Sequence, residues 1–183
     1  MKAFLLHYLP RLVEGWVHEQ HFLLVPHEGK SDLDKSIPRK LKSWREPGAC
    51  FVVLRDNDGA DCRVLKERLV ALCRSSGRSA LIRLVCQELE AWYLGDAAAL
   101  AKAYPEATKE IQRLNRRFPD PDACLKPSRT LERSLPSFQK RDAARRLGSL
   151  LNHETNRSAS LRVFSQGVQR LASPTGIEPV SHA

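Results

Sequence analysis

Two aspartates, Asp56 and Asp58, come one residue after CFVVL (50–54), the most apolar strand-like run of the sequence. Residues two apart on an extended backbone point to the same side and lie roughly 6.6 Å apart along it. Two carboxylates presented in this way repel each other, which raises the pKa of at least one of them unless a cation lies near both. Mg²⁺ suits such a pair because it binds one or two carboxylates together with waters and phosphate oxygens. The spacing therefore predicts that Asp56 and Asp58 bind Mg²⁺ or Mn²⁺.

Other kinds of acidic turn compete with this metal site. An EF-hand loop counted from Asp56 requires glycine at its sixth position and an acid or amide at its fifth, where this sequence has Asp61 and Ala60. A dinucleotide-binding turn requires a G-x-G-x-x-G motif, which does not precede the aspartates. A phosphoacceptor aspartate of the receiver type and a solvated Asp-x-Asp-Gly turn both stay open as alternatives.

Further candidate residues lie near the same predicted sheet. Glu88 and Glu90 come just after ALIRLVC (80–86). We expect one of them to complete the metal shell as a catalytic carboxylate, since ligands bind beyond the carboxyl ends of parallel strands. Carboxylates at the start of a helix also complement its dipole, which is the simpler explanation. Lys30 and Ser31, in an E-G-K-S stretch, are candidates for phosphate contact, although the first glycine of a P-loop is absent.

The elements that would position these residues follow from apolar periodicity. Short apolar runs predict strands, and apolar stripes at a spacing of three to four residues predict helices. In chain order these are a helix at 2–13, a strand at 21–25, a helix capped by Ser36 and reaching about 45, a strand at 50–54, a helix at 61–74, a strand at 80–86, and then helices only. This order predicts an α/β fold with a small, mainly parallel sheet flanked by helices. We expect an α/β core over 1–95, a helical C-terminal part packed on it over 96–172, and a disordered tail over 173–183.

The composition is that of a soluble globular protein with a basic surface. Of 183 residues, 42% are hydrophobic and 28% charged, and the net charge of +9 favours a polyanionic partner such as nucleic acid. Five cysteines without a C-x-x-C pair indicate neither a disulfide framework nor a zinc ribbon, so we expect reduced, mostly buried thiols in a cytoplasmic protein. His7 and Pro10 interrupt the N-terminal apolar run, which excludes a signal peptide, and no apolar run is long enough to cross a membrane.

Four separated motifs together resemble one known family. They are PHEGKSDLDKSIPRKLKSWREPG, FVVLRDNDGADC, VCQELEAWYLGD and NRSASLRVFSQGVQRL. In this order they resemble the bacterial domain-of-unknown-function family numbered 4276, grouped with TOPRIM-like folds, over residues 2–172. TOPRIM domains of primases, topoisomerases and overcoming-lysogenization-defect nucleases use a strand-end glutamate and a D-x-D pair to hold magnesium. Asp56 and Asp58 match that pair, and Glu90 matches an E-x-W element of related families.

The resemblance implies a function as well as a fold. It implies a magnesium-dependent nuclease or related phosphodiester enzyme, and it suggests an ATPase partner and a role in phage or mobile-element defence. The alternative is a non-catalytic subunit that binds an ATPase or nucleic acid.

One motif of the family is missing from its expected place. In the family, an acidic strand-end segment similar to E-E-P-S-M-K precedes the first helix, whereas this sequence starts at the matching M-K. We therefore expect a TOPRIM-like core that lacks its first strand and first glutamate. Glu14 imitates the TOPRIM glutamate-glycine but leaves no room for a helix before the strand at 21–25. Glu28 is better placed, after that strand, although in the family pattern it belongs to the second strand; the alternative is a loop acid beside His27.

Overall fold

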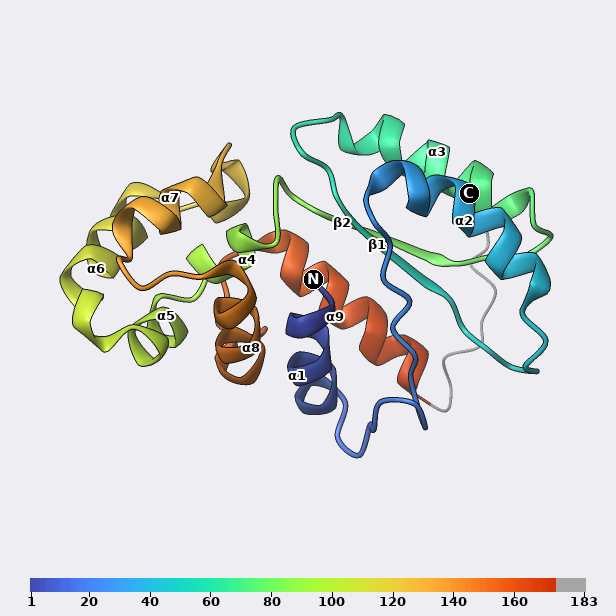
Figure 1. Ribbon diagram of the computed structural model, residues 1–183, viewed down its shortest axis with the longest axis horizontal. Coiled ribbons are helices and arrows are strands. Elements are labelled where there is room, and N and C mark those ends of the chain that lie inside the picture. Colours follow the sequence, from blue (N-terminus) through green and yellow to red (C-terminus); the bar gives the residue numbers. More distant parts are fainter. Residues whose placement is uncertain (174–183) are drawn as a thin grey trace.

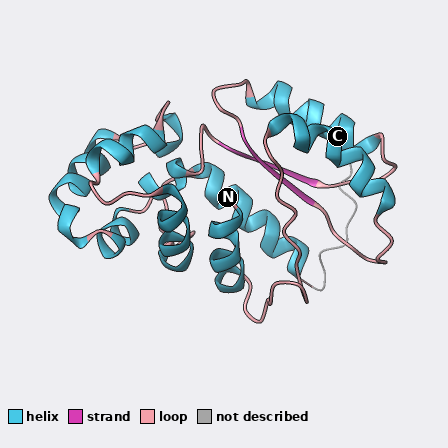
Figure 2. Ribbon diagram, in the orientation of Figure 1, coloured by secondary structure: helices cyan, strands magenta, loops and turns pink. Residues whose placement is uncertain are grey.

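The computed structural model describes residues 1–173, which form a small α/β layer and a larger helical part (Figure 1 and Figure 2). The strands β1 (Val52–Asp56) and β2 (Leu81–Val85) form a two-stranded parallel sheet. The α-helices of the described residues are α1 (Lys2–Leu12), α2 (Lys30–Ser43), α3 (Cys62–Arg74), α4 (Glu90–Leu94), α5 (Ala97–Ala103), α6 (Thr108–Arg117), α7 (Pro127–Ser134), α8 (Lys140–Leu150) and α9 (Ala159–Ala172). The predicted α/β class, with a small parallel sheet and a helical C-terminal part, is confirmed.

Helices cover both faces of the sheet. Val52 pairs with Leu81 and Asp56 with Val85, so both strands end at the same edge. On one face, α2 and α3 pack against buried strand residues such as Ile82, and α9 passes along the other face (Figure 1). Continuous apolar strands are typical of a parallel sheet that is covered in this way.

The helix α3 leads from the end of β1 back toward the start of β2. Its N-cap, Asp61, accepts hydrogen bonds from the backbone N–H groups of Arg63 and Val64 at 2.8 and 2.9 Å. The cap satisfies two N–H groups that have no partner within the helix. Leu65 and Leu69 follow at helical spacing and are buried against the sheet. These contacts fix the point at which the acidic turn ends.

Although α1 is the first helix in the chain, it packs within the helical part. Its Phe4 and Tyr8 are buried in the same apolar cluster as Trp92. The helices α1 and α8 approach closely at Gly148, where a Cβ atom would lie 2.6 Å from the carbonyl oxygen of Phe4. The Tyr8 hydroxyl also hydrogen-bonds to Ser165 Oγ at 2.7 Å, which ties α1 to α9. The N-terminal helix therefore shares its core with the C-terminal helices.

The segment just before α9 fastens the helical part to the chain that follows β2. Asn156 Nδ2 donates a hydrogen bond to the carbonyl oxygen of Trp92 at 2.8 Å. The guanidinium of Arg157 donates to the carbonyl oxygens of Leu94 and Phe118 at 2.9 and 2.7 Å. The first two residues of the motif NRSASLRVFSQGVQRL, Asn156 and Arg157, therefore have a structural role as hydrogen-bond donors.

The predicted strand at 21–25 is wrong. The described residues contain only β1 and β2 as sheet strands, and this segment makes no more than an isolated bridge between His18 and Phe22. Phe22 and Leu24 pack against the helical core, while Leu23 is 52% exposed. The apolar residues of the segment serve burial against helices, because no neighbouring strand supplies backbone partners.

The predicted N-cap at Ser36 is wrong as well. The helix α2 begins at Lys30, after Gly29, whose φ of 125° lies in the range that glycine alone adopts readily. Ser36 and Pro38 both lie inside α2, and Ser36 is buried. The helix therefore starts after the positive φ angle of Gly29, and the Ser36 hydroxyl does not cap it.

Several further expectations are settled by the described residues. The helices predicted at 2–13 and 61–74 and the strands predicted at 50–54 and 80–86 are confirmed, with every end within two residues of its prediction. The predicted tail at 173–183 lies outside the described residues except for Ser173, the C-cap of α9. Within 1–173, no helix combines the length and the apolar character needed to pass through a membrane.

The cysteines are less buried than expected. Cys50 and Cys62 are exposed, Cys86 is half-buried, and only Cys73 and Cys124 are buried. The expectation of mostly buried thiols is therefore wrong, while all five are free thiols.

Candidate metal site

The acidic residues predicted from the sequence meet at the edge where both strands end. Asp56 is the last residue of β1, Asp58 lies in the following turn, and Glu88 and Glu90 come after β2. A pocket of about 380 Å³ lies here, lined by Met1, Ala3, Asp56, Asp58, Glu88, Leu89, Glu90, Lys140, Arg141 and Ala144. Parallel strands thus bring all four predicted carboxylates to one pocket.

A larger hollow lies elsewhere, on the outer surface of α3. It measures about 580 Å³ and is lined by Arg63, Lys66, Glu67, Val70, Ala71 and Arg74. None of the predicted site residues lies in it. We therefore place the candidate chemistry in the smaller, acidic pocket.

Asn57 organises the turn between the two aspartates. Its Oδ1 accepts hydrogen bonds from the backbone N–H groups of Gln87 and Gly59 at 2.5 and 3.4 Å, and its Nδ2 donates to the carbonyl oxygen of Ala60 at 3.0 Å. Asp58 and Gly59 have φ angles of 47° and 79°, so the chain leaves the extended conformation as soon as β1 has ended. The prediction of two carboxylates side by side on an extended strand is therefore wrong. Asp58 reaches the pocket from a left-handed turn.

The surroundings of Asp56 disfavour its charged form. Burial, followed by the negative charges of Asp58, Glu90 and Glu88, raises the pKa of Asp56 to about 7. Its Oδ1 is buried and has no hydrogen-bond partner. A buried carboxylate oxygen without a donor, facing like charges, is stabilised strongly by a nearby cation.

The two glutamates after β2 have different surroundings. Glu90, the first residue of α4, is 8% exposed, and burial raises its pKa although the positive charge of Lys140 opposes the shift. Glu88 turns toward α7, where its Oε2 accepts a hydrogen bond from the backbone N–H of Ser128 at 3.0 Å. Glu88 thus has a structural partner, and Glu90 is the better candidate to act in the pocket.

A lysine already lies against one of the aspartates. Lys30 Nζ is 2.5 Å from Asp58 Oδ2, and the two side chains are 51% and 34% exposed. Across residues 1–173, no three His, Cys, Asp or Glu side chains converge closely enough to hold a metal ion. Ser31, the other predicted phosphate contact, is exposed in the first turn of α2 and does not line the pocket.

Sequence analysis missed two cations of the pocket, Lys140 and Arg141 at the start of α8. No local pattern connects α8 with the strand ends, because it reaches the pocket by packing against α1. The pocket therefore combines carboxylates from the strand ends with positive charge from the helical part.

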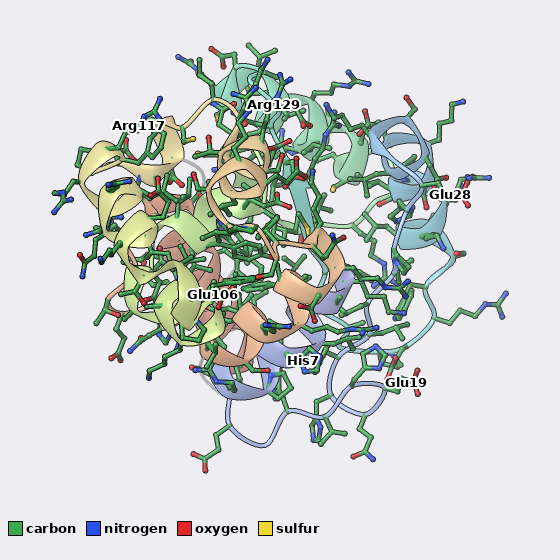
Figure 3. All side chains as sticks on the ribbon, turned by 60° about the vertical axis from the view of Figure 1, so that its left-hand side comes forward. His7, Glu19, Glu28, Glu106, Arg117 and Arg129 are labelled. Atoms are coloured by element: carbon green, nitrogen blue, oxygen red, sulfur yellow. The ribbon has the colours of Figure 1, made fainter. Side chains whose placement is uncertain are left out.

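Other charged residues of interest lie away from the pocket. Arg117 in α6 and Arg129 in α7 are exposed at the periphery of the helical part (Figure 3). Glu28 lies on the opposite side of the same view, in the loop before α2, and Glu14 is exposed after α1. Neither glutamate lines the pocket.

The fold and the pocket define a small α/β protein with an acidic site at the sheet edge and a helical C-terminal part. The family model of the Domain of unknown function (DUF4276) matches residues 1–172, so the chain belongs to this family. Comparison with curated proteins and with solved structures found no match. The family membership implied by the four sequence motifs is confirmed, and the relationship to TOPRIM domains stays a prediction.

Proposed function

We propose that this protein is a magnesium- or manganese-dependent nuclease, or a related enzyme that cleaves phosphodiester bonds. One observation carries the proposal: Asp56 Oδ1 is buried without a partner, among the carboxylates of Asp58, Glu88 and Glu90. Such a group is unstable without a counter-charge. A hard divalent cation that prefers oxygen ligands supplies one.

The residues of the pocket fit Mg²⁺ or Mn²⁺ in charge and in donor atoms. Asp56 and Asp58 would hold the ion, and Glu90, which does not converge with them as a third direct ligand, would complete its shell through a bound water. No closed cage of protein ligands is needed, because Mg²⁺ keeps several waters and also uses phosphate oxygens. When bound, the ion polarises a phosphoryl oxygen and lowers the pKa of the attacking water.

The remaining side chains would handle the proton and the substrate. Burial raises the pKa of Glu90, which makes its carboxylate a stronger base for the proton of the attacking water. Lys30, Lys140 and Arg141 supply positive charge beside the pocket and would bind phosphate oxygens. If the Asp58 carboxylate binds the metal ion, Lys30 would lose its ion pair with Asp58 and could contact a substrate phosphate instead.

A nucleic acid is the substrate that the charge of the protein favours. The net charge is +9, and Lys and Arg side chains that neutralise phosphates add affinity without sequence preference. Exposed basic residues lie on α2 and α6, namely Arg39, Lys40, Lys42, Arg113, Arg116 and Arg117. The TOPRIM resemblance extends the proposal to an ATPase partner and to defence against phages or mobile elements.

A non-catalytic binding subunit of an ATPase or nucleic-acid complex is the second candidate. The ion pair between Lys30 and Asp58 favours it, because the chain itself then neutralises one of the two predicted metal ligands. In that case the basic helices bind the partner and the acidic pocket takes no part in chemistry.

Nuclease assays with Mg²⁺ or Mn²⁺ on single- and double-stranded DNA and RNA separate the two candidates. We expect Asp56→Ala and Asp58→Ala to abolish cleavage and also the rise in Tm that the metal causes. Glu67→Gln is the matched control, because it removes an exposed carboxylate on α3 outside the pocket. If both aspartate variants keep activity and metal-induced stabilisation, the metal assignment is wrong. Binding without cleavage by the unmodified protein supports the second candidate.

A further inference from the structure

Two thiols meet beside the acidic turn. Cys62 is the first residue of α3, and Cys86 directly follows the last residue of β2. Although they are far apart in the sequence, their side chains are neighbours. Burial, the Asp122 carboxylate and then the Cys62 thiol raise the pKa of Cys86 to about 11. Asn57, whose Nδ2 contacts Cys62 Sγ, also accepts a hydrogen bond from the backbone N–H of Gln87, the residue after Cys86. Cys62 is exposed and Cys86 is half-buried, so solvent reaches the pair from the side of Cys62.

The backbone at the strand ends holds this thiol pair in place. The backbone N–H of Asn57 donates to the carbonyl oxygen of Val85 at 2.9 Å, and its Nδ2 donates to Cys62 Sγ at 3.1 Å. The backbone N–H of Cys86 donates to Ser160 Oγ at 3.5 Å. Both strand ends and the start of α3 thus fix where the two sulfurs lie. Neighbouring thiols held in this way need only a short movement to reach the S–S bond length of about 2.05 Å.

We propose that Cys62 and Cys86 are a redox-active pair that a peroxide converts to a reversible disulfide. The exposed sulfur of Cys62, as thiolate, attacks one oxygen of hydrogen peroxide. The O–O bond breaks, Cys62 becomes a sulfenic acid, and the hydroxide that leaves is protonated to water. Cys62 reacts first because it is the exposed member of the pair.

The second step closes the disulfide. The sulfur of Cys86 attacks the sulfur of Cys62, the S–S bond forms, and the S–O bond breaks. The leaving hydroxide takes the thiol proton of Cys86 and departs as a second water. In total, two thiols are oxidised and one peroxide is reduced, with no metal or nucleic acid required. The reaction is therefore independent of the proposed nuclease function.

The other cysteines are separated from this pair by the fold. Cys73 and Cys124 are buried, with exposures of 2% and 3%. Cys50 is exposed but precedes β1, whereas Cys86 follows β2, so the parallel strands keep these two at opposite ends of the sheet. Cys50 is therefore a matched control, because it is an exposed thiol that the fold keeps away from Cys86.

The disulfide would join the first turn of α3 to the end of β2, beside the turn that carries Asp58. To test for it, the folded protein is treated with a limited amount of hydrogen peroxide, after which free thiols are counted and proteolytic peptides are mapped by mass. We expect the free thiols to fall from five to three per chain. A peptide pair joined through Cys62 and Cys86 should appear, lighter by about 2 Da than the two free peptides together, and dithiothreitol should reverse it.

Variants assign the roles of the two sulfurs. Cys50→Ser should form the same cross-link, and Cys62→Ser should form none. Since Cys62 is exposed, its serine variant is expected to fold. Cys86→Ser lacks the resolving thiol, so peroxide should leave a sulfenic acid at Cys62 that dimedone traps. Oxidation of Cys62 at the rate of Cys50 without a cross-link to Cys86 would overturn the proposal, and so would preferential pairing of any other two cysteines.

Discussion

Different kinds of interaction stabilise the small α/β layer and the helical part internally. In the α/β layer, two helices cover a short sheet with aliphatic side chains, and the buried carboxylate of Asp34 binds Arg55 and Arg68 at 2.6 and 2.8 Å. In the helical part, aromatic rings pack around Trp92, and side chains such as Asn156 hydrogen-bond to backbone carbonyls. The helical part also has the larger apolar cluster, so we expect it to resist local unfolding better than the α/β layer.

The candidate site lies where these two regions meet. Asp56 and Asp58 belong to the α/β layer, whereas Glu90, Lys140 and Arg141 belong to the helical part. Neither region alone carries both the predicted metal ligands and all the positive charge of the pocket. The site therefore depends on how the two regions pack against each other, and substitutions in either region test this dependence.

The largest effect is expected in the aromatic core. Trp92 is 0% exposed, packs against Phe4 and Phe164, and donates a hydrogen bond to Ser160 Oγ at 2.8 Å. We expect Trp92→Ala to lower the free energy of unfolding by about 4 kcal/mol, because it removes buried contacts and leaves a cavity. Denaturant titration followed by circular dichroism measures the change. Leu125→Ala, at a position 76% exposed, should change it by less than about 0.5 kcal/mol.

The ion pairs of the α/β layer should give the next largest effect. Asp34→Asn removes the charge that faces Arg55, whose side chain is only 11% exposed. We expect a loss of about 3 kcal/mol in the free energy of unfolding, since an unpaired buried cation is left behind. The control is Asp142→Asn, which breaks an exposed pair with Arg146 and should cost less than about 1 kcal/mol. Equal effects of the two substitutions would contradict the central role of Asp34.

The carboxyl of Asp56 should make the stability of the protein depend on pH. Its pKa is about 7 in the folded protein and 3.8 when unperturbed, so the folded state binds more protons between these values. Without divalent ions, the free energy of unfolding should therefore fall as the pH rises from about 4 to about 7. Asp56→Asn should remove this slope and stabilise the protein by about 2 kcal/mol at pH 8. Parallel pH profiles of the two proteins would show that Asp56 does not titrate in this way.

The smallest effect compares two buried tyrosines of the helical part. The Tyr8 hydroxyl hydrogen-bonds to Ser165 Oγ at 2.7 Å, whereas the Tyr93 hydroxyl is buried without a partner. We expect Tyr8→Phe to cost about 1 kcal/mol of unfolding free energy. Tyr93→Phe should be neutral or slightly stabilising, because it removes an unsatisfied polar group. Thermal unfolding curves of both variants, measured side by side, decide the matter.

Sequence patterns predicted the parts of the fold whose signals are local. The apolar runs at 50–54 and 80–86 are strands, and the leucine stripe that follows Asp61 is a helix. The strand prediction for the similar run at 21–25 is wrong because a strand needs a neighbouring strand, and residues 1–173 offer this run no continuous pairing partner. Propensity describes what a segment favours, and the tertiary fold decides whether a partner exists.

The candidate site was predictable only in part, for the same reason. Asp56 ends β1, Asp58 follows it and Glu90 follows β2, and parallel strand ends bring all three to one edge without further information. Lys140 and Arg141 reach the pocket through helix packing over a long stretch of chain, which leaves no pattern in the local sequence.

The position of α1 also sets an order of events during synthesis. Tyr8 finds its hydroxyl partner, Ser165, 157 residues further along the chain. Phe4 and Leu9 pack in a cluster to which α8 and α9 contribute, so α1 stays without these partners while the middle of the protein is being made. Closing so long a loop is slow, and exposed apolar surface is prone to aggregation in the meantime. We therefore expect a nascent chain to present an apolar helix to chaperones until α9 has left the ribosome.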